Sequence, residues 1–353
     1  RQRQMCIRDR RMDDLINCLS TAWFKSSIDL TSGYWQIPIA EEDRKKTTFI
    51  CPLGLYRFKR MPFGAKNSGP AFQRAMDRIL HGLQWRRAPT YIDNCGIWSG
   101  KGEDHVAIVD KVLERFRLAG AKLNAKKCEF GTVRINYLGL IVDVDGLHLS
   151  DERTKSIREF PVPTTAAKLR RFLGMVSWCR RFIKDFARIA KPLYVATTAP
   201  GKLQMGDPEI AAFERLKQLM TSAKVMKIFD FSKPCLVRTD ASKNGMGGVL
   251  LQKDDDGVLR VVEYASRQSN KAQRNYTTEQ MEAMAVVWAL KKWRPYLVVR
   301  KFTLQVDNNP ITWLLRSKEL SGMIARWVMV LQEFEFDVQH IPGTSNVMAD
   351  TLS

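Results

Sequence analysis

The sequence of 353 residues lacks the cysteine and histidine patterns of small metal-bound or disulfide-stapled domains. Its seven cysteines are scattered without a C-x-x-C pair, and its four histidines form no cluster with them. These absences exclude a zinc ribbon and a disulfide framework, and they fit a reducing compartment. No apolar run reaches the roughly 18 residues of a membrane span, and no secretion signal is visible. We therefore expect a cytoplasmic protein with no membrane partner.

The composition is that of an ordinary globular protein with a large excess of positively charged residues. Hydrophobic residues make up 45% and charged residues 27%, which is typical of a folded protein. The length predicts two or three domains. A formal net charge of +20 says little about fold, but it favours polyanionic partners such as nucleic acid.

Hydrophobic periodicity divides the chain into three parts. Residues 1–147 mix short strands and helices, with a strand predicted at 23–30 and a hairpin at 89–98. Residues 148–223 are helical, and an apolar rhythm of 3.6 residues runs from Leu169 to Phe186. From 224 on, five strand patterns (235–240, 247–252, 261–266, 302–307 and 334–340) and a long helix at 277–293 predict a mixed sheet covered by helices.

The polar face of the middle helical segment is strongly basic. It carries eight cations against one acid, Asp185; the cations are Lys168, Arg170, Arg171, Arg180, Arg181, Lys184, Arg188 and Lys191. Such a face can be merely solvated. Its imbalance nevertheless favours contact with a phosphate backbone.

Several acids stand at the ends of apolar strands, where a carboxylate needs a partner or a metal ion to offset its desolvation. They are Asp29 and Asp93 in the first part, and Asp240, Glu282, Asp307 and Asp350 in the last. Converging acids of this kind would bind Mg²⁺ or Mn²⁺, and two such ions suit phosphoryl transfer. Each acid taken alone is better explained as a helix cap or a surface salt bridge, because spacing does not show convergence.

Eight further segments stand in a recognisable order. They are SIDLTSGYWQI (27–37), MPFGAKNSGPAFQ (61–73), YIDN (91–94), LNAKKCEF (123–130), YLG (137–139), FLGMVSWCRRFI (172–183), VRTDAS (237–242) and HIPGTSNVMADTLS (340–353). With them the chain resembles, from about residue 12 to its end, the reverse transcriptase–RNase H portion of a gypsy-type LTR retrotransposon Pol polyprotein.

The resemblance implies an α+β fold. Residues 1–147 would form a right-hand polymerase palm with partial fingers, 148–223 a helical thumb or connection, and 224–353 an RNase H-like mixed α/β domain truncated at its C-terminus. The implied activities are RNA-directed DNA polymerase and ribonuclease H, in retrotransposon replication within a cytoplasmic virus-like particle. The partners would be an RNA template, a DNA primer, their hybrid and deoxynucleoside triphosphates. The oligomeric state stays open.

The resemblance also assigns residues to the polymerase site. Asp29, Asp93 and the Leu30 carbonyl would hold two Mg²⁺ or Mn²⁺ ions, and Tyr34 would exclude a 2′-hydroxyl. The nucleotide pocket would be completed by Phe63, Gly64, Tyr91 and Asn94. Lys127 would protonate the departing pyrophosphate, with Lys126 beside it as an alternative. The primer end would be gripped by Tyr137, Leu138 and Gly139.

For the last part, the resemblance makes Asp240, Glu282, Asp307 and Asp350 the metal-binding acids of an RNase H. Glu279 lies one helical turn from Glu282 and is more consistent with an acid at the helix start. The basic helix would track the duplex through Lys168, Arg170, Arg171, Arg180, Arg181 and Lys184.

The chain departs from the family pattern in a few places. Asn94 stands where the family has a second aspartate, which removes a negative charge beside the metal site. Asn308 replaces a common histidine, and the family's upstream finger segment would precede residue 1. A second hypothesis is therefore a decayed element that binds nucleic acid with impaired polymerase and surviving RNase H activity.

Overall fold

The computed structural model describes residues 12–19, 22–222, 225–306, 314 and 322–341. The chain divides into two compact units, Arg1–Leu147 and His148–Ser353, and each is described by itself. In this described part of the chain, every helix falls short of the length and apolarity needed to cross a bilayer.

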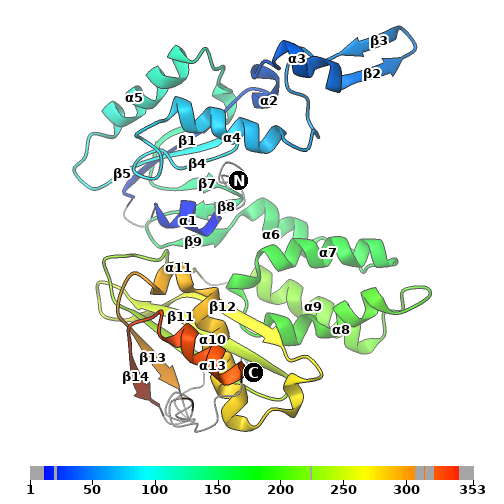
Figure 1. Ribbon diagram of the computed structural model, residues 1–353, viewed down its shortest axis with the longest axis vertical. Coiled ribbons are helices and arrows are strands. Elements are labelled where there is room, and N and C mark those ends of the chain that lie inside the picture. Colours follow the sequence, from blue (N-terminus) through cyan, green and yellow to red (C-terminus); the bar gives the residue numbers. More distant parts are fainter. Residues whose placement is uncertain (1–11, 20–21, 223–224, 307–313, 315–321, 342–353) are drawn as a thin grey trace. The chain divides into compact units, whose positions relative to one another are not determined.

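The first unit combines three small sheets with short helices (Figure 1). Its helices are α1 (Met12–Asn17), α2 (Gly33–Gln36), α3 (Glu41–Arg44), η2 (Lys45–Thr47), α4 (Ser68–Ile79), α5 (His105–Leu118) and η3 (Ala125–Lys127). Its strands are β1 (Phe24–Asp29), β2 (Thr48–Cys51), β3 (Gly54–Arg57), β4 (Thr90–Tyr91), β5 (Asn94–Ser99), β6 (Glu129–Thr132), β7 (Ile135–Tyr137) and β8 (Leu140–Val142), with β9 (Leu147–Leu149) at its end.

The main sheet of this unit has the strand order β4-β5-β1-β6, and its central strands are antiparallel. Ile28 of β1 is paired with Cys95 of β5, and both pack against Phe72 of α4 and Phe116 of α5 in one buried cluster. Because side chains alternate along a strand, Asp29 and its partner Asn94 point to the opposite face of the sheet. The helices thus cover one face and leave the acidic end of β1 on the other.

The second unit begins with α-helices and continues into a sheet (Figure 1). The helices are α6 (Asp151–Arg158), α7 (Ala166–Trp178), η4 (Arg180–Phe182), α8 (Phe186–Thr198), α9 (Asp207–Thr221), η5 (Gln273–Asn275), α10 (Thr278–Lys292), α11 (Arg294–Leu297) and α13 (Gly322–Leu331). The strands are β10 (Cys235–Ala241), β11 (Gly245–Lys253), β12 (Leu259–Gln268), β13 (Phe302–Val306) and β14 (Phe336–His340).

The helical rhythm from Leu169 to Phe186 does not belong to one helix. The helix α7 ends at Trp178, and Asp185 adopts a left-handed conformation (φ 62°) before α8 starts. The break does not disturb the apolar pattern because Phe182 and Ile183, which lie between the helices, are buried as well. Periodicity alone therefore predicted the buried positions and missed the turn.

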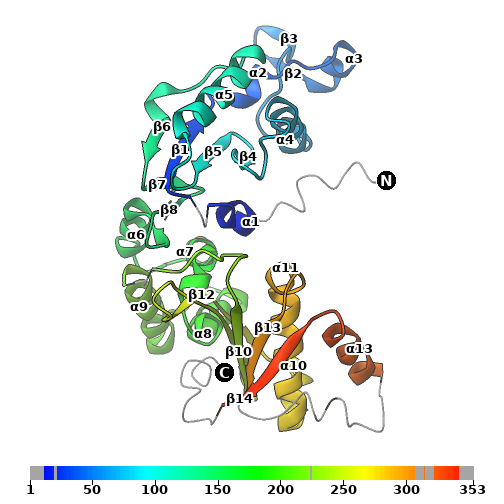
Figure 2. The same ribbon diagram turned by 90° about the vertical axis from the view of Figure 1, so that its left-hand side faces the viewer.

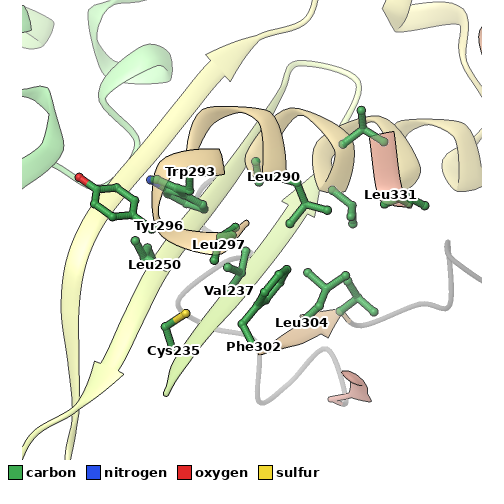
Figure 3. Close-up of a cluster of buried hydrophobic side chains, with 14 of the residues drawn as sticks. Cys235, Val237, Leu250, Leu290, Trp293, Tyr296, Leu297, Phe302, Leu304 and Leu331 are labelled. Carbon is green, nitrogen blue, oxygen red and sulfur yellow. The ribbon is translucent and has the colours of Figure 1, made fainter. Parts of the chain in front are cut away.

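The sheet of the second unit has the order β12-β11-β10-β13-β14. The first three strands are antiparallel, whereas β13 and β14 are parallel to their neighbours, so the expected mixed sheet is present. The helix α10 lies along one face, with α13 beside it (Figure 2). Between this helix and the strands, Val237, Leu250, Leu290 and Trp293 form part of a cluster of buried hydrophobic side chains (Figure 3).

Candidate active sites

The first candidate site lies where β1 ends beside the hairpin of β4 and β5. Asp29 is the direct cross-strand partner of Asn94, and Asp93 immediately precedes Asn94 in the hairpin turn. The structure thus brings together the two acids that the sequence separates by 64 positions. The Asp29 side chain keeps 29% of its surface exposed, so its carboxylate is open to a ligand.

Lys127 reaches this site from η3. Its Nζ lies 3.8 Å from Asp29 Oδ1 in an exposed ion pair. The segment is anchored because the backbone N–H of Asn124 donates to the Asp29 carbonyl at 2.9 Å. Lys126 is exposed, and the described ion pairs do not include it. The geometry therefore favours Lys127 over Lys126 as the cation of the site.

Leu30 follows Asp29 and forms an isolated antiparallel bridge with Leu123. The hydrogen bonds of this bridge run through the neighbours of Leu30: the Asp29 carbonyl accepts from Asn124, and the Thr31 N–H donates to Lys122. The Leu30 side chain is buried in the core. The Leu30 side chain thus points into the core, and only its backbone carbonyl is left as a possible ligand at the site.

Tyr34 is held by aromatic neighbours near the hairpin. Its ring centroid lies 5.1 Å from that of Phe63 and 5.0 Å from that of Phe72. Partial burial, together with the negative charge of Asp93 and the nearby Tyr91, raises the pKa of Tyr34. Tyr34 therefore stays neutral and lies close enough to Asp93 to share its electrostatic environment.

The loop before α4 supplies the other predicted pocket residues. Phe63 is exposed, and Gly64 has a φ of +82°, a conformation in which other residues are strained. Ser68 closes the loop by donating from its hydroxyl to the Pro62 carbonyl at 3.1 Å. The structure thus brings Phe63 to Tyr34, and Gly64 sets the turn between Phe63 and α4.

Gln73 is a buried polar residue to which the sequence motifs assigned no role. It is buried on α4, where its Oε1 accepts from the Ile92 N–H at 2.8 Å and its Nε2 donates to the Thr90 carbonyl at 3.3 Å. Ile92 has a positive φ of 54° in the turn before Asp93. Gln73 therefore positions the hairpin that carries Asp93. In the sequence, only its place at the end of the 61–73 motif pointed to a role for it.

The residues at this site fit a divalent cation. Two carboxylates on neighbouring strands offer the oxygen ligands that Mg²⁺ and Mn²⁺ prefer. Asn94 Oδ1 is buried, and no described group donates a hydrogen bond to it. Among the described residues, however, no group of three or more His, Cys, Asp or Glu side chains gathers in one place. At the end of β1 a third acid is missing because position 94 carries the neutral side chain of Asn94.

The second candidate site is in the second unit. Asp240 is the penultimate residue of β10, Glu282 lies in the second turn of α10, and both are buried, with 6% and 3% exposure. Their neighbours Ala241, Met284 and Ala285 pack in one small cluster with Met246. The two acids thus come from elements that are packed together at this end of the sheet.

Asp307 and Asp350 lie outside the described residues, and so does Asn308. Glu279, by contrast, is an exposed acid in the first turn of α10. Hydrogen bonds from the backbone N–H at this helix start and from Thr277 lower the pKa of Glu279. Its environment is that of an acid at a helix N-terminus rather than of a buried metal ligand.

Two predicted nucleic-acid contacts need correction. Tyr137 has no exposed surface, and its hydroxyl donates to the Pro89 carbonyl at 2.9 Å. Its ring also packs against Gly96, where any larger residue would collide with it. Tyr137 therefore supports the sheet and does not contact a primer. Leu138 and Gly139 form the turn of the β7–β8 hairpin with positive φ, and both are partly exposed.

Arg181 is the second correction, because it is buried with 8% exposure. It faces Glu263 of β12, which also forms an ion pair with Lys292 at 2.6 Å and accepts from Trp293 Nε1 at 3.1 Å. Burial alone would raise the pKa of Glu263, but Arg181 and Lys292 lower it further than burial raises it. Arg181 thus neutralises a buried acid instead of binding phosphate.

The other predicted basic contacts remain available. Lys168, Arg170, Arg171 and Arg180 are exposed, and Lys184 is partly buried. Lys168 donates to the Thr164 hydroxyl at 3.2 Å and Arg170 to the Thr197 carbonyl at 3.4 Å, so neither is neutralised by these contacts.

Family models match both units. Residues 2–142 match the reverse transcriptase (RNA-dependent DNA polymerase) model, and 230–334 match the RNase H-like domain found in reverse transcriptase. The chain is 35% identical to the retrovirus-related Pol polyproteins from transposons 297 and gypsy of Drosophila melanogaster, over 97% and 95% of its length. It is 32% identical over 93% of its length to the transposon Tf2-7 polyprotein of Schizosaccharomyces pombe.

The chain is a homologue of gypsy-type LTR-retrotransposon Pol polyproteins. It holds a reverse transcriptase domain followed by an RNase H-like domain. It spans 32%, 33% and 25% of the length of these three relatives.

Solved structures agree on the fold. A foamy viral protease-reverse transcriptase in complex with RNA/DNA hybrid superposes with a TM-score of 0.83 at 22% identity, covering 96% of this chain and 47% of that one. The same protein in complex with dsDNA gives a TM-score of 0.80 at 21% identity, covering 93% of this chain and 70% of the other. The palm and RNase H-like architecture expected from the sequence is confirmed.

Proposed function

We propose that this chain synthesises DNA on an RNA template and degrades the RNA strand of RNA–DNA hybrids during retrotransposon replication. The observation that carries the proposal is the pairing of Asp29 with Asn94, which sets Asp29 beside Asp93 in a homologue of reverse transcriptases. The buried acids Asp240 and Glu282 support the nuclease activity in the same way.

In the polymerase unit, Asp29, Asp93 and the Leu30 carbonyl would hold Mg²⁺ or Mn²⁺. The bound ions would lower the charge on the triphosphate and make the primer hydroxyl a better nucleophile. Tyr34, fixed between Phe63 and Phe72, would exclude a ribose 2′-hydroxyl. Lys127 would give a proton to the leaving pyrophosphate oxygen; its Nζ already lies beside Asp29.

In the second unit, Asp240 and Glu282 would hold the corresponding ions together with Asp307 and Asp350. The exposed lysines and arginines of α7 and η4 would contact the duplex backbone, which needs no base recognition. We further propose that residues 148–223 act as the thumb or connection and 224–353 as the RNase H domain, and that the chain works in the cytoplasm.

Reciprocal active-site variants test this function. The chain should extend a DNA primer on an RNA template with deoxynucleoside triphosphates and Mg²⁺, and it should cut the RNA of a labelled hybrid. Asp29→Asn should abolish extension while leaving cleavage intact, and Asp240→Asn should do the reverse. A folded protein in which both activities survive both substitutions would refute the assignment.

The hypothesis of a decayed, non-polymerising element is supported by Asn94, which stands where the family has a second aspartate. The matched families are enzyme domains, and the neighbouring acids Asp29 and Asp93 are both in place. The comparisons therefore favour the enzymatic function.

A further inference from the structure

A small basic notch lies on the second unit, between α8 and the sheet edge formed by β11 and β12. Its volume is about 140 Å³, and its lining includes Arg188 and Lys191 of α8, Arg267 of β12 and Asn244 of the β10–β11 turn. No acidic side chain lines it. Three basic residues, Arg188, Lys191 and Arg267, thus contribute to the walls of this notch together with polar ones.

The notch is rigidly built. The Ala187 N–H donates to Ser266 Oγ at 2.9 Å, and Gln268 Nε2 donates to the Ala187 carbonyl at 2.7 Å, so the start of α8 is fastened to β12. Gly245 closes the other side, where a Cβ would come within 2.7 Å of the Arg267 carbonyl. The walls are therefore set by hydrogen bonds and close packing before any ligand arrives.

The positive charge in the notch is only partly neutralised. Arg188 forms an ion pair with Asp185 at 2.6 Å, which offsets its charge. Lys191 and Arg267 have no ion-pair partner among the described residues, and the exposed Lys243 stands next to Asn244. The notch therefore offers two uncompensated cations and an amide, which suits a single phosphate group.

The register of the sheet places this notch close to Asp240. Ser266 is paired with Gly247, and Gly247 is paired in turn with Asp240, so the three residues form one row across the strands. Two inter-strand spacings of about 4.8 Å put Asp240 roughly 10 Å from Ser266. A phosphate in the notch would lie on the same strand end as the nuclease acids.

We propose that this notch binds one backbone phosphate of the RNA–DNA hybrid and thereby holds the duplex in register with Asp240. The inference rests on the proposed nuclease function and adds a contact outside its acids. Lys191 and Arg267 bind the phosphate oxygens, and Asn244 donates to them from its amide. These residues position the substrate and take no part in bond cleavage.

The test compares two double variants with the same loss of charge. The double variant Lys191→Gln/Arg267→Gln removes the two positive side-chain charges of the notch that are not paired with an acid among the described residues. Lys202→Gln/Lys253→Gln is the matched control, because Lys202 lies beyond the C-terminal end of α8 and Lys253 at the far end of β11. Hybrid affinity is measured by fluorescence anisotropy between 50 and 200 mM salt (a range of about fourfold that resolves counterion release).

The notch variant should bind the hybrid about tenfold more weakly, and its slope of log affinity against log salt should fall by about one to two. The control should change affinity less than about twofold. An equal loss of hybrid affinity in both variants would show that only net charge matters and would overturn the proposal. An unchanged affinity of the notch variant would overturn it as well. If inorganic phosphate raised the melting temperature of the wild type, but not of the notch variant, while hybrid affinity was unchanged, the notch would be a site for free anions and the proposal would fail.

Cleavage separates this inference from the proposed function. The notch variant should still cut the hybrid at saturating concentration, but at shifted positions, because one register contact is lost. A wild type that binds the hybrid through the notch but never cuts it would refute the nuclease function alone. An unchanged cleavage pattern together with unchanged affinity would refute the notch alone.

Discussion

The two units hold their acids in opposite ways. In the first unit, Asp29 and Asp93 are partly exposed at a strand end and a tight turn, beside the ring of Tyr34 and the exposed side chain of Lys127. In the second unit, Asp240 and Glu282 are buried beside a small apolar cluster that includes Met246, Met284 and Ala285. The difference shows that a fold can bring acids together either at partly exposed backbone turns or by burying them between packed elements.

Burial has a cost that exposure does not. An ionised carboxylate loses its hydration inside a protein, so the fold must supply charge or metal to stabilise it. The second unit does this visibly at Glu263, which is surrounded by Lys292, Trp293 and Arg181. The first unit relies instead on the hydrogen bonds of Gln73 to hold a hairpin in a strained turn. Substitutions at five positions test this contrast.

Asp240→Asn should have the largest effect. We expect hybrid cleavage to fall on the order of 10³-fold, since a charge that stabilises the transition state is removed. The melting temperature should stay equal or rise, because a buried neutral amide avoids the desolvation of a carboxylate. The exposed Asp256→Asn is the control and should change neither quantity. A large drop in melting temperature for Asp240→Asn would show that the acid is structural.

Lys292→Met should destabilise the second unit by about 3 kcal/mol, because it leaves Glu263 buried with less compensating charge. Chemical denaturation monitored by circular dichroism measures the effect. Lys291→Met, on the adjacent exposed residue, should stay within about 0.5 kcal/mol of the wild type.

The same acid predicts a pH dependence. The folded pKa of Glu263 is lowered, so its stabilisation is complete above the unfolded value of about 4.3 and is lost as pH falls through the folded pKa. Glu263→Gln should flatten the decline in unfolding free energy below that pH. If the free energy of unfolding fell with pH in the same way in the wild type and the variant, another group would be responsible for the acid dependence.

Gln73→Leu should lower the kcat of primer extension about thirtyfold, because the hairpin that carries Asp93 loses its two hydrogen bonds with the Gln73 side chain. The KM for the nucleotide should change little. Gln73→Glu keeps an acceptor for the Ile92 N–H and should recover part of the rate. Equal KM and kcat losses in both variants would point to general unfolding of the first unit.

Asn94→Asp should have the smallest effect, a gain of about tenfold in primer extension, equal to ~1.4 kcal/mol of barrier. The added charge lies opposite Asp29, where divalent cations would bind. Asn136→Asp adds the same charge at an exposed position of β7 and should leave the rate unchanged. No gain from Asn94→Asp would show that the missing acid does not limit this polymerase.

The sequence predicted most elements of the fold because their signals are local. The strand at β1, the hairpin of β4 and β5, the long helix α10 and all five strands of the second sheet were visible as alternation, turn residues and helical periodicity. The motifs also marked Asp29, Asp93, Asp240 and Glu282 from residue type and order. The break between α7 and α8 was missed because both sides of the turn bury apolar residues in the same rhythm.

Tertiary structure alone decided which polar residues face solvent and which face one another. Nothing local distinguishes Arg181 from Arg180, yet one is buried against Glu263 and the other is exposed. Tyr137 and Gln73 likewise gained their roles from partners 48 and 19 positions away. A sequence records what each side chain is able to do, whereas long-range packing and desolvation select the partner with which it does so.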